Sequence, residues 1–562
     1  MLVRRYTDLE AQSGGEPSRS DWQHMLHPDV AARLARLTPD QRTAATAPPG
    51  PVLCVAPAGS GKTTTLIARI AWLIDGGAAP DTVAAITFNK RAADELAERL
   101  DTALAALGIP PHKVRVRTFH ALGREILRDA GMDVSRLVGR STLLGELFPD
   151  LPTAAHGRYD SAFSRLKLEY AVTGDDVAAD PEAGPMSRAF VRYEQALAER
   201  GALDFDDLVR RALACLDTDA GLLARWRSRC GHLLVDEVQD VDRSQLMLAL
   251  LLAEPLNRIF LVGDDDQSIY GWRLADVRRV LSLDAVLPGL RRVDLEVNHR
   301  CPIPVVERAV RLITHNQERF AKTIRARPDA PGVLILAPDA GDEPGRTTRL
   351  LGSWPDDEGT QAVLARTNRE LRPAVIGALA LGLPFRAAKI DLLVDDPTLN
   401  DLLDRIHAET PAAWPLLVRI DRVRRTVAVD RRELATAVLA WAAPYPDLDA
   451  LRLAIDTTRR RIAELRRDDA RLSFATVHST KGSEFDHVAV VGMDEGRFPS
   501  GRAVSEAEDP LRALEEERRL GYVAWTRARR TLTLSYDPGA PSPFLLEAFS
   551  PDELGLSDTM PR

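Results

Sequence analysis

Cysteine is scarce in this sequence of 562 residues, and its spacing excludes several kinds of site. The four cysteines, Cys54, Cys215, Cys230 and Cys301, lie far apart and form no CxxC pair. A disulfide framework, a zinc ribbon and an iron–sulfur cluster therefore find no support. No apolar run approaches the ~18 residues of a membrane span. The two arginines near the start precede no apolar segment, so we expect a cytoplasmic protein without a secretory signal or a membrane partner.

Lysine is the second scarcity, because only seven of the 74 basic residues are lysines. Arginine suits phosphate contacts, but we attribute so strong a bias to genome composition. Each lysine that does occur therefore invites a specific explanation. The net charge of -8 points away from a generally basic nucleic-acid binder, although binding needs only a local basic groove.

The remaining composition is that of a folded protein, with 45% hydrophobic and 28% charged residues. At roughly 150 residues per domain the length predicts three or four domains. Short apolar β-rich segments alternate with helical ones in two series, which favours parallel sheets built from βαβ units. The first series is 52–56, 83–88, 114–119, 233–236 and 259–263. The second is 293–297, 333–337, 362–365, 472–477, 488–491 and 531–535.

The fold class predicted from these series is α/β, with two parallel-sheet cores that each carry a mainly helical insertion. The stretch from Arg419 to Arg432 in the second insertion holds six arginines and two aspartates. We interpret it as a solvated helix face in preference to a nucleic-acid contact. The predicted parts are an N-terminal extension (1–37), a first core (38–122 and 204–285) with its insertion (123–203), a second core (286–396 and 470–545) with a smaller insertion (397–469), and a tail (546–562).

The strongest single motif is Ala-Pro-Ala-Gly-Ser-Gly-Lys-Thr at residues 56–63, between a predicted strand and a predicted helix. Glycines let the backbone wrap around phosphate oxygens, Lys62 would reach the β- and γ-phosphates, and Thr63 would bind Mg²⁺. The alternative is a glycine-rich turn, since the strict motif has glycine where Ala56 stands. The motif predicts an ATP site formed by Ala58, Gly59, Ser60, Gly61, Lys62, Thr63 and Thr64.

Two further motifs carry acidic and aromatic groups. Asp236 and Glu237 follow an apolar strand, where Asp236 would hold the metal and Glu237 would act as general base. Such a pair is otherwise an exposed strand end. After three consecutive aspartates, Gln267 would sense the γ-phosphate, whereas Trp272 and Arg273 form a pair that stacks on bases and holds phosphate. A lone tryptophan is otherwise a core residue.

The order of these and other motifs resembles the superfamily-one helicases of the UvrD/PcrA/Rep type, from about Leu37 to Tyr536. The resemblance rests also on the segments 37–41 (LTPDQ), 86–93 (ITFNKRAA), 118–121 (TFHA), 204–208 (DFDDL), 296–300 (EVNHR), 476–485 (TVHSTKGSEF) and 516–528 (EERRLGYVAWTRA).

The resemblance implies that both cores are RecA-like P-loop cores, and it implies roles for residues that the motifs alone leave open. Gln41 would read adenine, Glu484 would bind the ribose, and His299 stands where the family has an adenine-stacking tyrosine. Arg300 and Arg527, both expected from the second core, would reach the γ-phosphate. The implied DNA contacts are Phe88, Thr118, His120, Trp272, Arg273 and His478, although a histidine at such a place is otherwise structural.

We therefore expect an ATP- and Mg²⁺-dependent helicase or translocase on single-stranded DNA and its junctions with duplex, with 3′→5′ polarity implied by the resemblance. Its setting would be DNA repair, recombination or defence. The short second insertion suggests a reduced accessory domain. Its reduction would leave either a translocase that needs a protein partner to replace it or an enzyme relieved of its regulation. The alternatives are a non-catalytic, helicase-like scaffold subunit and a P-loop ATPase acting on RNA or protein.

Overall fold

The computed structural model describes residues 26–151, 153–179, 184–354, 357–387, 390, 392–428 and 431–556. The chain divides into two units, which we describe separately: residues 1–300 with 313–328, and residues 301–312 with 329–562. Parts of the predicted N-terminal extension (1–25) and tail (557–562) lie outside the described residues. No helix in the described part of the chain has the length and apolar character needed to cross a membrane.

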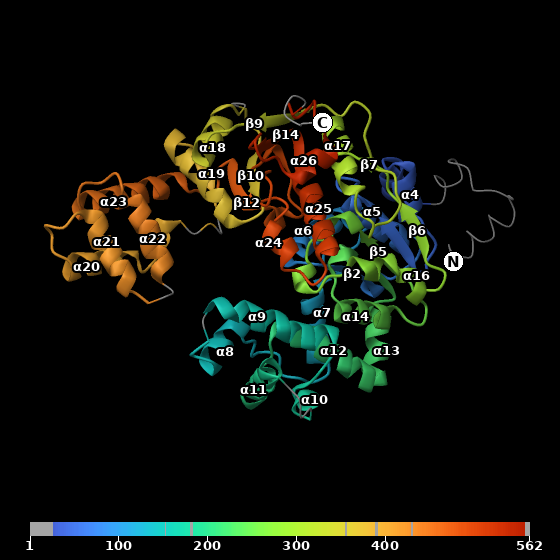
Figure 1. The fold of residues 1–562 in the computed structure, drawn as a ribbon. Helices are drawn as coiled ribbons and strands as arrows, with labels where there is room; N and C mark the ends of the chain where they lie inside the picture. The colour runs from blue at the N-terminus through green and yellow to red at the C-terminus, as the bar shows by residue number, and fades with distance from the viewer. Residues whose placement is uncertain are drawn as a thin grey trace. The chain divides into compact units, whose positions relative to one another are not determined.

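The first unit is built on a six-stranded parallel sheet in the order β3-β2-β4-β5-β1-β6. Figure 1 labels β2, β5 and β6 of this sheet. Alternate residues of β1 face opposite layers: Val52 and Cys54 pack into one apolar cluster, and Leu53 and Val55 into the other. Because helices cover both faces, the central strands are continuous apolar runs. The strands are β1 (Val52–Val55), β2 (Val83–Thr87), β3 (Arg115–Thr118), β4 (His232–Val235), β5 (Ile259–Gly263) and β6 (Arg291–Asp294).

Helices of the first core form the layers over this sheet. Those on the side of Val52 include α3 (Pro28–Ala35), α5 (Lys62–Asp75) and α6 (Lys90–Ala105). Those on the side of Leu53 include α7 (Phe119–Asp129), α12 (Phe205–Thr218), α13 (Ala220–Arg229) and α14 (Arg243–Ala253). The remaining helices are α4 (Pro39–Ala45), α15 (Val277–Leu281) and α16 (Leu283–Val286).

The helical insertion of the first unit has its own apolar cluster, which includes Phe163, Phe190 and Tyr193. Its helices are α8 (Arg140–Leu147), α9 (Thr153–Ser164), the π-helical turn η2 (Arg165–Glu169), α10 (Gly174–Ala178) and α11 (Pro185–Glu199). The predicted start of the insertion at residue 123 falls inside α7, whose apolar side packs on the sheet of the core.

Two other predicted boundaries of the first core differ from the structure. The second core was expected from residue 286, but β6 pairs with β1 and completes the first sheet. The end of the expected N-terminal extension is also part of this core, because Val30 and Leu34 of α3 are buried against it.

The second unit contains another six-stranded parallel sheet, in the order β11-β12-β10-β13-β14-β9. Its strands are β9 (Val333–Pro338), β10 (Gln361–Ala365), β11 (Phe385–Arg386), β12 (Leu472–Thr476), β13 (Phe485–Val490) and β14 (Ala528–Tyr536). Its core helices are α17 (Ile303–Ile313), α18 (Glu343–Gly352), α19 (Asn368–Leu381), α24 (Gly501–Ser505), α25 (Pro510–Trp525) and α26 (Pro543–Ala548). Two parallel-sheet cores with helical insertions are thus present, as the sequence predicts.

The insertion of the second unit is a bundle of helices with an apolar cluster of its own (orange in Figure 1). Its members are α20 (Leu399–Glu409), α21 (Leu416–Thr426), α22 (Arg432–Trp441) and α23 (Leu448–Leu465). The prediction of a solvated arginine face holds only in part, because Arg419 is buried and donates to the Thr410 hydroxyl and the Ile406 carbonyl.

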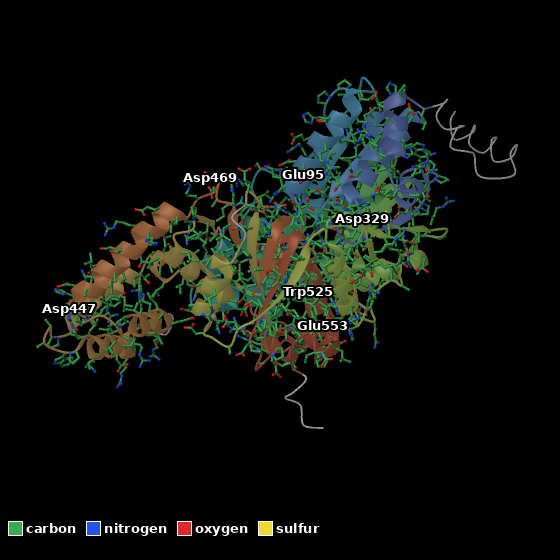
Figure 2. All side chains as sticks on the ribbon, turned by 90° about the horizontal axis from the view of Figure 1, so that it is seen from above. Glu95, Asp329, Asp447, Asp469, Trp525 and Glu553 are labelled. Carbon is green, nitrogen blue, oxygen red and sulfur yellow. The ribbon has the colours of Figure 1, made fainter. Side chains whose placement is uncertain are left out.

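The predicted tail from residue 546 is wrong for the residues up to 556 that the structure describes. Ala548, Phe549 and Leu554 are buried. Phe549 lies 6.2 Å from the ring of Trp525, which is labelled in Figure 2. These apolar side chains extend the second core beyond its predicted end, because they find a packing surface on α25.

Candidate functional site

The predicted phosphate and catalytic residues follow three neighbouring strands of the first sheet. The loop at residues 56–63 follows β1, Gln267 lies just beyond β5, and Asp236 and Glu237 follow β4. Since β4, β5 and β1 are parallel and adjacent, their carboxyl ends meet at one edge. Ligands of open parallel sheets bind at this edge.

The loop after β1 is shaped by two glycines with positive φ, Gly59 (68°) and Gly61 (85°). A Cβ at Gly59 would lie 2.8 Å from the Cβ of Arg300, and one at Gly61 would lie 2.6 Å from Nε2 of Gln41. Both positions therefore need glycine for conformation and for space. The buried Ser60 hydroxyl has no hydrogen-bond partner among the described residues, and Lys62 Nζ donates to the Ala56 carbonyl at 2.9 Å.

Residues expected to contact the nucleotide base surround this loop. Gln41 of α4 donates to the Ser60 carbonyl at 2.8 Å and accepts from the Thr38 N–H at 3.1 Å. The backbone N–H of His299 donates to the Gly59 carbonyl at 2.9 Å. Burial lowers the pKa of the His299 imidazole below its usual value.

Arg300 differs from its prediction. It was expected from the second core, but it belongs to the first unit. The reason is the short strand β7 (Val297–Asn298), whose Asn298 side chain donates to the Ala58 carbonyl at 2.7 Å and holds this segment on the loop.

The acidic pair after β4 is electrostatically strained. Burial raises the pKa of Asp236 to about 7, repulsion from Glu237 adds to the rise, and the Lys62 ammonium opposes it. Glu237 has a φ of 53°, in the left-handed region, and accepts from Gln239 Nε2 at 2.6 Å. The site therefore favours a bound cation, whose charge would stabilise the ionised carboxylate. Thr63 of α5 is half-buried and Thr64 is exposed.

A cavity of about 510 Å³ in the first unit gathers four of the predicted DNA contacts, Phe88, His120, Trp272 and Arg273. The Trp272 side chain is 58% exposed, so the alternative of a core tryptophan is wrong. The Arg273 guanidinium lies 4.7 Å from its ring. Burial lowers the pKa of His120, so this imidazole is neutral near pH 7. Thr118 caps α7 by accepting from the Ala121 N–H, and it is not among the lining residues.

Two aromatic residues were missed from the sequence: Phe205, which lines this cavity, and Tyr270, which contacts the lining residue Phe88. Tyr270 stacks on Phe88 at 5.0 Å between ring centroids, and Phe205 lies edge-on to His120 at 5.8 Å. Phe205 is 60% exposed and lies between two aspartates, Asp204 and Asp206, at the start of α12. An aromatic residue flanked by charged ones was the available signal.

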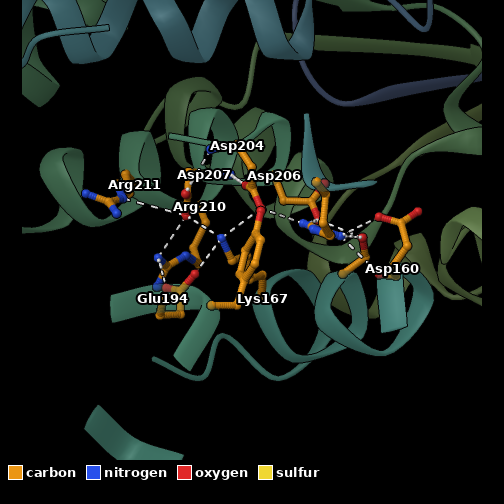
Figure 3. A network of polar contacts seen from close by, with 11 residues as sticks. Asp160, Lys167, Glu194, Asp204, Asp206, Asp207, Arg210 and Arg211 are labelled. Atoms are coloured by element: carbon orange, nitrogen blue, oxygen red, sulfur yellow. Dashed lines mark hydrogen bonds and ion pairs between the residues drawn. The ribbon is translucent and has the colours of Figure 1, made fainter. Parts of the chain in front are cut away.

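A network of ion pairs joins the start of α12 to the helical insertion (Figure 3), and its members Arg140 and Asp204 line the cavity. Lys167 contacts Glu194 at 2.7 Å, Asp204 at 3.0 Å and Asp207 at 3.1 Å, and its side chain is 0% exposed. Arg140 binds Asp204 at 2.7 Å beside these contacts. The network fixes the insertion to Asp204 and Asp206, the residues on either side of Phe205.

Three predicted site residues lie in the second unit. Arg527 is buried and donates to the carbonyls of Val523 and Ser483. Glu484, the next residue, is ion-paired with Arg529. His478 lies in the turn η8 (Val477–Thr480), where burial, with a contribution from Arg366, lowers its pKa to about 4. The structure thus brings Arg527 and Glu484 together at the start of β13 and β14.

Comparison with known proteins gives consistent matches to both halves of the chain. The UvrD/REP helicase N-terminal domain matches residues 37–288, and the UvrD-like helicase C-terminal domain matches residues 453–538. DNA helicase II of Escherichia coli (strain K12) is 28% identical over 90% of this chain and 85% of its own length. ATP-dependent DNA helicase PcrA of Leuconostoc citreum is 26% identical over 86% of this chain and 80% of its own length.

Proposed function

The chain belongs to the UvrD-like DNA helicase family, and from this premise we propose how its residues perform ATP-dependent DNA unwinding. Use of ATP and binding of DNA follow from the family. We further propose that the chain moves 3′→5′ along single-stranded DNA, binds junctions of single and double strands, and uses Mg²⁺. The observation that carries the proposal is the grouping of Lys62, Asp236, Glu237 and Gln267 at one edge of the first sheet.

The loop after β1 fits a nucleotide triphosphate by its shape and its polar groups. Its glycines leave no room for side chains, and the unpartnered Ser60 hydroxyl is a buried polar atom that a ligand would satisfy. The backbone N–H groups of residues 58–64 and the Lys62 ammonium would hold the phosphates, whereas Thr63 and Asp236 would hold the cation. When bound, the magnesium nucleotide supplies the phosphoryl group and the charge that offsets repulsion at Asp236.

The neighbouring side chains have separate tasks in hydrolysis. Glu237 would orient a water molecule and accept its proton, and Gln267 would hold the γ-phosphate region by hydrogen bonds. Arg300 and Arg527 would stabilise negative charge there. Gln41, His299 and Glu484 would orient the base and the ribose.

The cavity with Phe88, Trp272 and Arg273 would bind single-stranded DNA, with Thr118, His120 and His478 as further contacts. Exposed aromatic rings stack on any base, so this contact carries no sequence preference. Phe88 follows β2 and Trp272 follows β5. The same sheet edge that holds the catalytic residues therefore also carries the DNA contacts.

The direct test is ATP hydrolysis with and without single-stranded DNA at fixed salt, with an RNA of the same length in parallel. We expect DNA to stimulate hydrolysis strongly and Lys62→Ala to abolish it. Lys113→Ala, which changes an exposed lysine of the same unit, is the control. Hydrolysis that survives in Lys62→Ala, or that RNA stimulates as well as DNA, contradicts the proposal.

Unwinding of tailed duplexes tests polarity and the proposed need for a partner. The second insertion is a small bundle, and we propose that a protein partner takes over part of the task of the larger accessory domain. We expect a 3′ tail to be required and unwinding by the isolated chain to be weak. Robust unwinding by the isolated chain at low concentration contradicts the partner.

A further inference from the structure

Three consecutive aspartates, Asp264, Asp265 and Asp266, are buried directly after β5. Taking three carboxylates out of water is costly unless cations and donors replace the water. Both cations that the structure pairs with them come from one segment of the first unit, residues 313–328. These are Lys322 and Arg319.

Lys322 contacts all three carboxylates. Its Nζ lies 3.1 Å from Oδ1 of Asp264 and 2.9 Å from Oδ2 of Asp266, it is also ion-paired with Asp265, and its side chain is 0% exposed. Arg319 binds Asp266 through two parallel hydrogen bonds of 2.9 and 2.8 Å. The segment is thereby fastened to the aspartate loop.

Hydrogen bonds lead from Asp264 to two of the proposed catalytic residues. Its Oδ2 accepts from Gln267 Nε2 at 2.7 Å. Its backbone N–H donates to Oε1 of Gln239 at 3.0 Å, and Nε2 of Gln239 donates to Glu237 at 2.6 Å. The position of Asp264 therefore sets the positions of the side chains of both Gln267 and Glu237.

The other end of the same segment reaches the phosphate-binding loop. Strand β8 (Arg325–Ala326) pairs with β7, and the Arg327 N–H donates to the Asn298 carbonyl at 3.0 Å. Asn298 in turn holds the Ala58 carbonyl. One segment is thus bonded to the groups that flank the nucleotide site on two sides.

We infer that Lys322 is a positioning residue for ATP hydrolysis, because it fixes Asp264 and through it the geometry of Gln267 and Glu237. The inference rests on the proposed function, which gives these two residues their roles. Lys322 is buried and lies outside every motif of the sequence. Its loss should lower turnover and leave the affinity for the nucleotide unchanged.

The test measures turnover per bound nucleotide in Lys322→Met, with saturating single-stranded DNA. Nucleotide binding is titrated separately with a fluorescent ADP analogue and Mg²⁺. We expect turnover to fall about tenfold or more, as for loss of a correctly placed general base, while the affinity for the analogue stays at the wild-type value. Lys113→Met is the control and should change neither quantity.

A second variant separates positioning from charge balance and from folding. Lys322→Met/Asp265→Asn removes one buried carboxylate together with the lysine, so it should regain thermal stability while its turnover stays low. Wild-type turnover in Lys322→Met or in the double variant overturns the inference. A parallel loss of nucleotide binding and turnover in both variants also overturns it. Absence of DNA-stimulated hydrolysis in the wild type would instead reject the proposed function.

Discussion

Replacing Lys167 by methionine should destabilise the helical insertion of the first unit. The lysine is enclosed by Glu194, Asp204 and Asp207, and methionine retains much of its volume while it removes the charge. Breaking a buried ion pair by removing one partner costs about 3–5 kcal/mol, because a charge stays buried without compensation. Arg140 and Arg210 remain beside these carboxylates, so we expect a value near the lower end of this range.

Amide hydrogen exchange in α11 measures this local opening, since the insertion can open without unfolding of the whole chain. A loss of about 3 kcal/mol corresponds to roughly a hundredfold faster exchange. Lys113→Met, at an exposed site, should leave exchange in α11 unchanged.

The difference between variant and wild type should also depend on pH. Burial alone would raise the pKa of Asp204, but Lys167 and Arg140 outweigh burial and hold it well below its usual value. The stabilisation that follows from the depressed pKa of Asp204 is complete above the unfolded-state pKa of about 4, and it declines as the pH falls below that value. Without Lys167 the carboxylate protonates more easily, so the difference should be smaller at about pH 3 than at about pH 7.5. Unchanged exchange, or a difference that grows on acidification, refutes the reasoning.

Two further variants probe the DNA cavity and the acidic pair. Trp272→Ala should weaken binding of an oligo-dT strand by about 1–3 kcal/mol in fluorescence anisotropy, whereas Leu453→Ala, which truncates an exposed residue of the second insertion, should not; equal affinities contradict the stacking role. Asp236→Asn should abolish hydrolysis, yet it should raise the thermal midpoint of unfolding measured without divalent cations. The increase should be larger at about pH 8 than at about pH 5, because a carboxylate whose pKa is raised to about 7 costs more stability as the pH rises toward that value. A lower midpoint at about pH 8 would contradict the burial of this carboxylate.

The central strands were predictable because buried parallel strands are continuous apolar runs. The predicted segment 259–263 coincides with β5, whose residues are all buried. The edge strand β6 was placed too late, since its first residues, Arg291 and Arg292, are exposed arginines without an apolar pattern. Strands β7, β8 and β11 are two residues long and leave no periodicity to detect.

The residues of the candidate site were predictable where a short sequence motif is enough to indicate their chemical role. The loop at residues 56–63 and the acidic pair need only local spacing to be interpreted. Phe205 and Lys322 act through neighbours that the fold supplies. The partner of Lys322 at Asp264 is 58 residues away in sequence, and no local pattern indicates that contact.

Two of the few lysines, Lys167 and Lys322, occupy the same kind of environment. Each has a side chain that is 0% exposed, and each contacts three carboxylates from a single ammonium group. An ammonium carries three donors that diverge from one atom, whereas a guanidinium directs its donors within one plane and pairs best with one carboxylate, as Arg319 does with Asp266. Arg140 also pairs with three carboxylates, but it does so through two guanidinium nitrogens and its side chain remains 8% exposed, whereas each of these two lysines reaches three carboxylates from one fully buried nitrogen.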